Sequence, residues 1–275
     1  TLAVLVGSFA AYKKELPHIW QLLEIIETPK WFFRLLALIV NRYGGEVIVA
    51  SNAVRDHWKC HVDSAKLHTV YYGIDASKIP SEKSSLRADL GLPADKLIIG
   101  MVGRVHYWKG QDYFLRIAGA LACEHNNLHF VMIGDAFPGY EYLYDEISKI
   151  IQEEHLKNKV TDLGYRTDIY NLIKGFDIFV QPSILPDPFP TVILEAMAVG
   201  LPVVATSLGG AKEMVTNSET GYLIDVGQAK ESAKSILKLV LSQEDRVKFG
   251  LRGKERINKK FTLNRYKSDY SKFFN

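Results

Sequence analysis

The sequence predicts an α/β protein in which part of one α/β domain precedes a doubly wound parallel sheet. From residue 96 onward, short apolar runs alternate with longer segments whose apolar residues recur at helical spacing. The run at 97–102 is apolar without interruption, as expected for a strand that helices cover on both faces. A helix between successive strands returns the chain by a right-handed crossover, so these strands should all run parallel.

The first part of the chain, residues 1–75, has the pattern of a partial domain. An apolar run and an apolar helix pattern lead to a strand-like run at 47–50, with Ser51 as the N-cap of the next helix. The turn-rich residues 73–75 and the polar segment 77–88 predict a linker. The chain starts without Met and reads at once as the middle of a domain, so we expect further protein before it.

A second domain is predicted at 76–258, followed by a closing segment at 259–275 that contains an aromatic-rich amphipathic helix. Because open parallel sheets bind ligands at the carboxyl ends of their strands, functional residues should follow the strands directly. The expected strands lie at 97–102, 128–133, 159–163, 177–180, 202–205 and 221–225, and the expected helices at 111–123, 140–155, 167–174, 191–199, 228–241, 244–258 and 261–274.

Composition excludes several classes of protein. With 47% hydrophobic and 24% charged residues among 275, the chain is an ordinary globular one rather than a disordered one. The net charge of +3 is slight and the basic residues are scattered, so no nucleic-acid partner is indicated. Cys60 and Cys123 form no CxxC unit, which favours a reducing, cytoplasmic location. The longest apolar stretch, 31–40, is about half the length of a membrane span and contains Arg34.

The segment Gly-Arg-Val-His-Tyr-Trp-Lys-Gly at 103–110 directly follows an expected strand. Gly103 lets the backbone approach a ligand closely, while Arg104 offers a planar fork for phosphate oxygens and Lys109 a point charge. The spacing is not that of a Walker A loop. Two solvated cations in a turn would explain these residues equally well, so this segment alone leaves phosphate binding open.

A stronger signal lies at 181–198. A strand ends near Pro182, a Pro-rich loop carries Asp187, and a helix begins near Pro190, a residue well suited to the first helical position. The amides at the start of that helix have no partner within it and would form a site for a diphosphate. These amides belong to Thr191, Val192 and Ile193.

Two further features belong to the same edge of the sheet. Glu195 lies about one turn into the helix, where it would accept hydrogen bonds from a ribose diol. The alternative is structural, with Asp187 capping the helix and Glu195 favouring its positive end. Residues 207–213, Ser-Leu-Gly-Gly-Ala-Lys-Glu, follow another strand and would form a nest of amides for an anion, although a plain Gly-Gly turn explains them equally well.

Taken together, these segments resemble the retaining glycosyltransferases of family 4, which have the GT-B fold of two Rossmann-like domains. The family pattern is a strand followed by G-R-x-x-x-x-K-G, a "P-S" strand end, two acids with seven residues between them, and "E-A-M-A-x-G-x-P-V-V-A-T" before "G-G-x-x-E". Here the two acids are Asp187 and Glu195, and the block "EAMAVGLPVVATSLGGAKEMV" matches almost continuously. The resemblance covers 96–225 and extends more loosely to "VIVASNAVRDHW" and "VYYGIDASKI".

The resemblance implies roles for residues at each strand end. Arg104 and Lys109 would hold the donor diphosphate, Glu195 the ribose hydroxyls, and Asp187 the transferred sugar. The base-binding loop would contain Gly164 and Arg166, together with Tyr165 between them. The last helix would cross back onto the N-terminal domain.

The implied reaction is the transfer of a hexose, with retention of configuration, from a UDP-, GDP- or ADP-sugar to a glycan or lipid-linked acceptor. It would serve polysaccharide or glycolipid biosynthesis, with no metal and no further cofactor, because two cations and a helix N-terminus would do the work of Mg²⁺.

Two departures from the family pattern stand out. The first acid is usually Glu and is Asp187 here, and the usual Asn of the hinge "N-G-I-D" is Tyr72. The family's N-terminal Gly-rich loop and its acceptor-site residues are not in this sequence. We therefore expect this chain alone to bind donor without transferring the sugar efficiently.

Alternative interpretations remain open. The chain could be a nucleotide-sugar epimerase on the same fold, or a donor-binding module without catalysis. His57, Cys60 and His61 have a spacing open to metal ligation, but no fourth ligand is evident, so we predict a structural helix and no metal site. The aromatic residues 31–33 beside Arg34 could contact a membrane surface, although packing in a core is the favoured interpretation.

Overall fold

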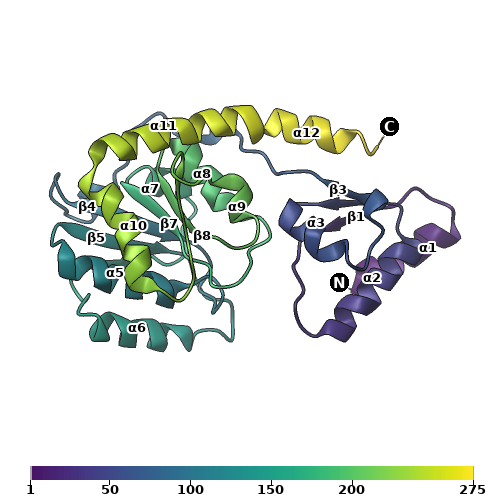
Figure 1. The fold of residues 1–275 in the computed structure, drawn as a ribbon, viewed down its shortest axis with the longest axis horizontal. Coiled ribbons are helices and arrows are strands. Elements are labelled where there is room, and N and C mark those ends of the chain that lie inside the picture. The colour runs from purple at the N-terminus through teal and green to yellow at the C-terminus, as the bar shows by residue number, and fades with distance from the viewer. Residues whose placement is uncertain (1, 275) are drawn as a thin grey trace.

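The computed structural model describes residues 2–274, which fold into two lobes joined along one side by the last helices (Figure 1). The smaller lobe contains a three-stranded sheet and the larger one a six-stranded sheet. Every strand pair in both sheets is parallel, with helices between successive strands. The predicted α/β class, with a doubly wound sheet and a partial second α/β domain, is confirmed.

The strand order of the large sheet determines where its ligand site can lie. The order is β6-β5-β4-β7-β8-β9, so β4, the first strand of this sheet along the chain, lies in the middle, and the order reverses between β4 and β7. At such a reversal, the connections leave in opposite directions and open a crevice beyond the strand ends. The strands are β4 (Leu97–Val102), β5 (Leu128–Ile133), β6 (Val160–Asp162), β7 (Ile178–Gln181), β8 (Val203–Thr206) and β9 (Gly221–Ile224).

Helices cover both faces of this sheet and bury a separate apolar core on each. One core contains residues of α5, α6 and α10, and the other residues of α7, α8 and α9, while α11 contributes to both. The continuous apolar run at 97–102 forms β4, and its four central residues are buried, as expected for a strand covered on both faces. The helices are α5 (Gln111–Glu124), α6 (Leu143–Glu153), α7 (Ile169–Ile173), α8 (Thr191–Val199), α9 (Ala211–Met214), α10 (Ala229–Leu241) and α11 (Gln243–Lys260).

The small lobe packs its sheet against helices around Trp20, Val40 and Trp58. Ser51 is the N-cap of α3, as predicted, because its hydroxyl accepts a hydrogen bond from the Val54 amide at 3.2 Å. Two of the three strands, β1 and β3, were not predicted from the sequence, because they are short and polar residues interrupt their apolar ones. The elements are α1 (Leu2–Lys13), β1 (Ile19–Leu22), α2 (Lys30–Tyr43), β2 (Glu46–Val49), α3 (Asn52–Trp58), η1 (Ser64–Lys66) and β3 (Leu67–Thr69).

The lobes are connected by a segment that contains η2 (Ala76–Lys78) and α4 (Leu86–Asp89), and by the C-terminal helix α12 (Leu263–Ser271). The backbone of Ile74 pairs with that of Phe261 and Leu263, at 2.7 and 3.0 Å, where α11 passes into α12. Tyr72, which replaces the Asn of the family hinge, packs its ring 5.7 Å from Phe189 and 5.5 Å from Tyr266. The substituted hinge residue is therefore an aromatic contact between the lobes.

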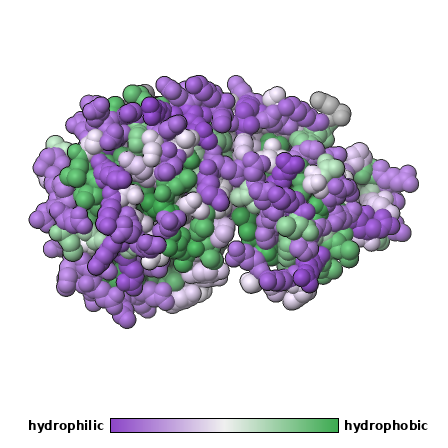
Figure 2. All heavy atoms as spheres, in the orientation of Figure 1, coloured by the Kyte–Doolittle hydropathy of each residue, from purple (hydrophilic) through white to green (hydrophobic). Residues whose placement is uncertain are grey.

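Figure 2 shows hydrophilic residues over most of the visible face, with hydrophobic patches between them. Among residues 2–274, no helix is long and apolar enough to cross a membrane.

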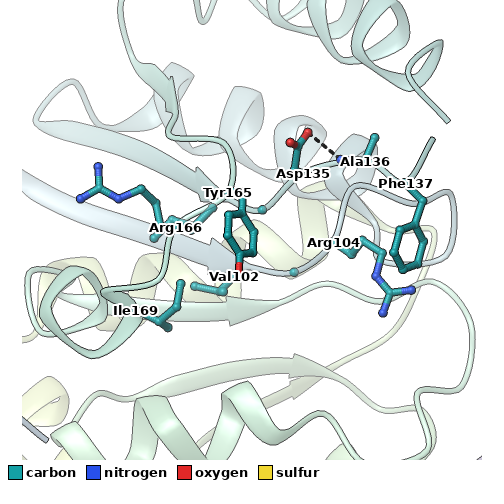
Figure 3. Close-up of a pocket in the computed structure, with 11 residues that line it drawn as sticks. Val102, Arg104, Asp135, Ala136, Phe137, Tyr165, Arg166 and Ile169 are labelled. Atoms are coloured by element: carbon teal, nitrogen blue, oxygen red, sulfur yellow. Dashed lines mark hydrogen bonds between the residues drawn. The ribbon is translucent and has the colours of Figure 1, made fainter. Parts of the chain in front are cut away.

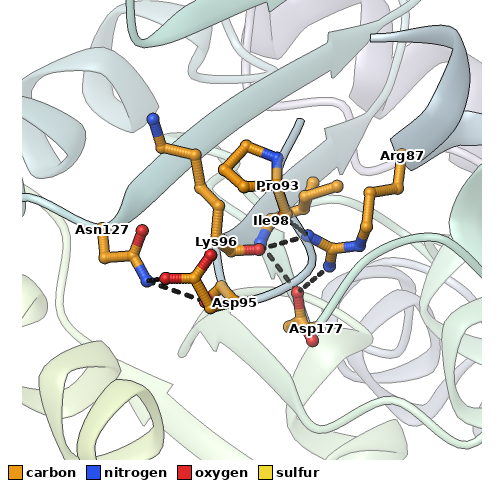
Figure 4. A network of polar contacts seen from close by, with 7 residues as sticks. All are labelled: Arg87, Pro93, Asp95, Lys96, Ile98, Asn127 and Asp177. Atoms are coloured by element: carbon orange, nitrogen blue, oxygen red, sulfur yellow. Dashed lines mark hydrogen bonds and ion pairs between the residues drawn. The ribbon is translucent and has the colours of Figure 1, made fainter. Parts of the chain in front are cut away.

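A polar network fastens the connecting segment to the amino ends of β4 and β7 (Figure 4). Arg87 donates to the carbonyl oxygens of Pro93 and Lys96 and to the carboxylate of Asp177, the last at 3.1 Å. The same Asp177 oxygen accepts the Ile98 amide of β4 at 2.8 Å. One carboxylate thus satisfies a buried strand amide and orients the arginine that holds the connecting segment.

We predict that Asp177→Ala lowers the free energy of unfolding by about 2 kcal/mol, because the buried Ile98 amide loses its acceptor. Asp177→Asn, which keeps an acceptor oxygen of the same shape, should cost less than half as much. Urea unfolding of the two variants beside the wild-type protein measures the difference. Equal losses in both variants would mean that the ion pair with Arg87, and not the amide, carries the effect.

Candidate active site

The candidate site lies where the strand order reverses, at the carboxyl ends of β4 and β7. The loops that leave these strands touch each other directly, since the Ile184 amide donates to the Trp108 carbonyl oxygen at 2.9 Å. Gly110 has φ +77°, and a Cβ placed there would lie 2.1 Å from the Pro182 carbonyl oxygen. Only glycine permits this approach of the two loops.

Lys109 and Asp187, predicted from separate segments, meet at this point. The ammonium of Lys109 lies 2.5 Å from Asp187 Oδ2, and the two side chains are only 18% and 9% exposed. The same ammonium lies 4.6 Å from the centre of the Trp108 ring. A pair so withdrawn from water persists because each charge compensates the other, and removing one partner would leave the other buried alone.

The Gly209–Gly210 turn fixes the backbone of the Asp187 loop. The Gly210 amide donates to the Asp187 carbonyl oxygen at 2.8 Å. Gly209 has φ +52°, and a Cβ there would lie 2.1 Å from that oxygen. The expected nest of amides for an anion therefore needs correction, because the Gly210 amide already has this acceptor.

Helix α8 begins at Thr191, as predicted, but Pro190 is its N-cap and not its first helical residue. Of the three amides expected to be free, that of Ile193 donates to the Pro190 carbonyl oxygen at 3.0 Å. Among the described contacts, the amides of Thr191 and Val192 have no acceptor, and no side chain caps the helix. Asp187 consequently does not serve as the cap, and two amides remain open toward a ligand.

Glu195 lies in α8 without a hydrogen-bond partner among the residues that the structure describes. Burial raises the pKa of its carboxyl group above the ordinary value of 4.5. Burial, and next the charge of Glu195, raise the pKa of Tyr170 to about 12. A carboxylate in such a place has acceptor capacity that a ligand hydroxyl would satisfy.

A first cleft of about 490 Å³ adjoins these groups on the side of β5 and β6. Arg104 and Phe137 form one wall, with the guanidinium carbon 4.0 Å from the centre of the Phe137 ring (Figure 3). Tyr165, which is 73% exposed, and Ile169 from α7 line the opposite side. The cleft thus combines apolar and aromatic walls with the cation of Arg104 at its edge.

The two ends of the loop after β6 make different contacts, one with the end of β5 and the other within the loop. The Gly164 carbonyl oxygen accepts the Gly134 amide at 2.9 Å, which ties this loop to the end of β5. Arg166 lines the cleft, but both of its donated bonds, at 2.8 Å, go to Asp168. Figure 3 shows its side chain extending away from Arg104.

A second cleft, of about 450 Å³, separates the two lobes. Residues 24–28 of the small lobe form one wall, and residues from the loops after β4 and β7 form the other. Arg104 lines both clefts, so it stands at the boundary between them. His106 lies in the second cleft, where burial, and then the charges of Arg104 and Lys109, lower its pKa.

Sequence reasoning assigned no role to the end of β5, although Asp135, Ala136 and Phe137 line the first cleft. The signal was available, because the strand predicted at 128–133 ends at the same edge as β4. Asp135 accepts hydrogen bonds from the Tyr144 hydroxyl and the Ala136 amide, which lower its pKa.

The possible metal ligands of α3 have other contacts. His57 Nε2 lies 3.1 Å from the Ile26 carbonyl oxygen, and the rings of His57 and His61 pack 4.5 and 5.0 Å from that of Phe33. Cys60 is exposed. These contacts are those of a structural helix.

The partly buried Glu195 predicts a measurable pH dependence. A native pKa above the unfolded one means that the native state binds the proton more tightly, so stability falls as the pH rises above 4.5 through the native pKa. We expect Glu195→Gln to melt at a higher temperature than the wild-type protein at pH 8, with the difference shrinking toward pH 4.5. Glu255→Gln, at an exposed position on α11, is the control and should leave melting unchanged. A Glu195→Gln variant that melts lower at every pH would contradict this account.

Comparisons with known proteins agree with this geometry. A family model described as "Glycosyl transferases group 1" matches residues 82–256. The Escherichia coli UDP-Gal:alpha-D-GlcNAc-diphosphoundecaprenol alpha-1,3-galactosyltransferase is 31% identical over 65% of this chain and 46% of its own length. The D-inositol 3-phosphate glycosyltransferase of Mycobacterium tuberculosis is 30% identical over 67% of this chain and 39% of its own length. The chain therefore spans less than half the length of these curated relatives.

Solved structures share the fold over nearly the whole chain. HepE of Anabaena, in complex with UDP and glucose, superposes with a TM-score of 0.92 and 27% identity, covering 100% of this chain and 76% of that one. Sucrose-phosphate synthase of Thermosynechococcus elongatus, at 20% identity, superposes with a TM-score of 0.84 over 98% of this chain and 71% of its own. The fold is that of the GT-B glycosyltransferases, and the chain belongs to the group 1 glycosyl transferases.

Proposed function

We propose that this protein transfers a sugar from a nucleoside-diphosphate sugar to an acceptor hydroxyl. The observation that carries the proposal is the meeting of Lys109 and Asp187 where β4 and β7 end, beside the open amides of α8. A cation, a carboxylate and a helix N-terminus at one sheet edge suit the two parts of such a donor, an anionic diphosphate and a polar sugar.

The diphosphate would lie between the loop after β4 and the start of α8. Lys109 and Arg104 supply positive charge, and the amides of Thr191 and Val192 supply directed donors at the positive end of the helix. These groups hold the charge that grows on the leaving phosphate as the bond to the sugar breaks. Lys109 then divides its hydrogen bonds between the phosphate and Asp187.

Asp187 and Glu195 would accept hydrogen bonds from the hydroxyl groups of the donor. Asp187, held by Lys109 and by the Gly209–Gly210 turn, has a fixed carboxylate from which to bind the transferred sugar. Glu195 would accept hydrogen bonds from the ribose hydroxyls, because its partly buried carboxylate has no partner among the described residues.

The base would occupy the first cleft, between Phe137 and the loop that contains Gly164, Tyr165 and Arg166. We propose uracil as the base. Support comes from the Escherichia coli relative, whose name specifies UDP-Gal, and from HepE, which is solved with UDP.

The acceptor would enter through the second cleft, between the lobes. Its hydroxyl oxygen would bond to the anomeric carbon on the face from which the phosphate departs, and its proton would pass to the departing phosphate oxygen. Configuration at that carbon would be retained.

We propose a glycan or a lipid-linked saccharide as acceptor, as the name of the Escherichia coli relative specifies a diphosphoundecaprenol-linked sugar. Helix α2 supports contact with a membrane surface, because Trp31 and Leu38 are 68% and 66% exposed beside Lys30 and Arg34. Of the aromatic residues at 31–33, Phe33 alone is buried in the core.

Substitution of the paired residues tests the proposed reaction. Lys109→Ala and Asp187→Asn should each lower the transfer rate roughly 100-fold or more, since each removes a group that acts on the breaking bond. Lys149→Ala is the matched control, because Lys149 is 75% exposed on α6 and meets only Glu153 among the described residues. Transfer at the wild-type rate by either site variant, with the fold checked by circular dichroism, would refute the assigned roles.

Calorimetry with UDP, GDP and ADP tests the donor. We expect UDP to bind most tightly, and Phe137→Ala to weaken its binding by widening the first cleft. Tighter binding of GDP or ADP would overturn the choice of base, and no binding of any nucleotide would overturn the proposed function itself.

A further inference from the structure

A single carboxylate of the large lobe, Glu213, receives three hydrogen bonds from the small lobe. Its Oε1 accepts the Ala53 amide at 2.8 Å, and its Oε2 accepts the Asn52 amide at 2.8 Å and the Tyr71 hydroxyl at 2.7 Å. Asn52 and Ala53 are the first residues of α3, whose amides have no partner within the helix. The first turn of a helix in one lobe is thus capped by a charged group from the other.

The start of the same helix also holds the loop that carries Asp187. The Ser51 hydroxyl is fully buried and donates to the Pro188 carbonyl oxygen at 2.7 Å, while accepting the Val54 amide. We call Ser51, Asn52, Ala53, Tyr71 and Glu213 the interlobe clasp. It ties the N-terminus of α3 to the loop after β7 and to the short helix α9.

The clasp is joined to the site by a short path of backbone. Glu213 lies on α9, three residues after Gly210, whose amide donates to the Asp187 carbonyl oxygen. A Cβ at Gly210 would lie 2.3 Å from the Pro188 carbonyl oxygen, the atom that Ser51 binds. Arg256 binds the C-terminal end of α9, because its guanidinium donates to the carbonyl oxygens of Glu213 and Met214 at 2.6 and 2.7 Å.

The protonation state of Tyr71 is compatible with its hydrogen bond to Glu213. Burial, followed by the hydrogen bond to Glu213, raises the pKa of Tyr71, so its hydroxyl stays protonated and can donate. The carboxylate therefore meets only donors.

From these contacts we infer that Glu213 is a positioning residue, which fixes the small lobe against the Asp187 loop and so sets the shape of the second cleft. The expected effect of Glu213 on turnover rests on the proposed function. The first cleft is lined only by residues of the large lobe, whereas the second has walls from both. Loss of the clasp should accordingly change turnover and leave nucleotide binding intact.

The two native cysteines allow a direct test of lobe orientation. Cys60 lies in the small lobe and Cys123 in the large one, both are exposed, and the sequence contains no others. Spin labels on both should give one narrow distance distribution in the wild-type protein. We expect a broader or shifted distribution in Glu213→Ala, a smaller change in Glu213→Gln, which keeps one acceptor oxygen, and none in the exposed control Glu255→Gln.

Kinetics separate positioning from a general loss of structure. Glu213→Ala should lower kcat by about ten-fold, the usual effect of losing a charge-assisted hydrogen bond, while the Kd for UDP changes less than two-fold. Ser51→Ala should also lower kcat. In the double variant, kcat should fall by less than the product of the two single effects, because both residues belong to the interlobe clasp.

Two outcomes would overturn the inference. One is a wild-type distance distribution and kcat in Glu213→Ala. The other is a fall in UDP affinity parallel to kcat with no change in distance. If the wild-type protein binds no nucleotide, the proposed function fails, yet the label distances still show whether Glu213 fixes the lobes.

Discussion

The ion pair between Lys109 and Asp187 is the contact on which the account of this protein depends. It joins residues 78 positions apart, and it exists because β4 and β7 are neighbours in the sheet although two strands lie between them in sequence. Glycines at the crossing points allow the loops to approach closely enough for the two charges to meet. A change in strand order would place these charges on different parts of the molecule.

The pair also explains how the site can be stable without a ligand and still bind a diphosphate. A lysine held in a largely buried place without a ligand needs a compensating charge, and Asp187 provides it. An arriving diphosphate offers the same lysine a second anion, so binding adds to an existing arrangement and requires little rebuilding. The open amides of α8 and the partly buried carboxylate of Glu195 complete a set of groups whose hydrogen-bonding capacity a nucleotide sugar would fill.

The sequence predicts the large lobe well because β4, β5, β7 and β8 are mostly buried and mainly apolar, with helical segments between them. The strand at 128–133 and the helix at 191–199 have the predicted bounds. In the small lobe, the strands at 19–22 and 67–69 are too short to show any periodicity, and only their pairing in the sheet reveals them. The family membership indicated by the spacing of the two acids is confirmed, whereas the roles of the individual site residues stay predictions.

What the sequence does not reveal are partnerships fixed by three-dimensional packing. Even two contacts between near neighbours in the sequence were not predicted, namely the pairing of Arg166 with Asp168 and the bond of the Ile193 amide within its own turn. Phe137 escaped notice because an aromatic residue after a strand carries no chemistry of its own until Arg104 stacks on it. The contacts of Glu213 with the small lobe join residues about 140 to 160 positions apart, far beyond any local pattern.

The central claim is that groups from the ends of β4 and β7 bind one diphosphate. A crystal structure of the protein with UDP tests it most directly. The account predicts phosphate oxygens within hydrogen-bonding distance of Lys109 Nζ and of the Thr191 or Val192 amide, with the base beside Phe137. A diphosphate bound elsewhere, with the Lys109–Asp187 pair untouched, would contradict it.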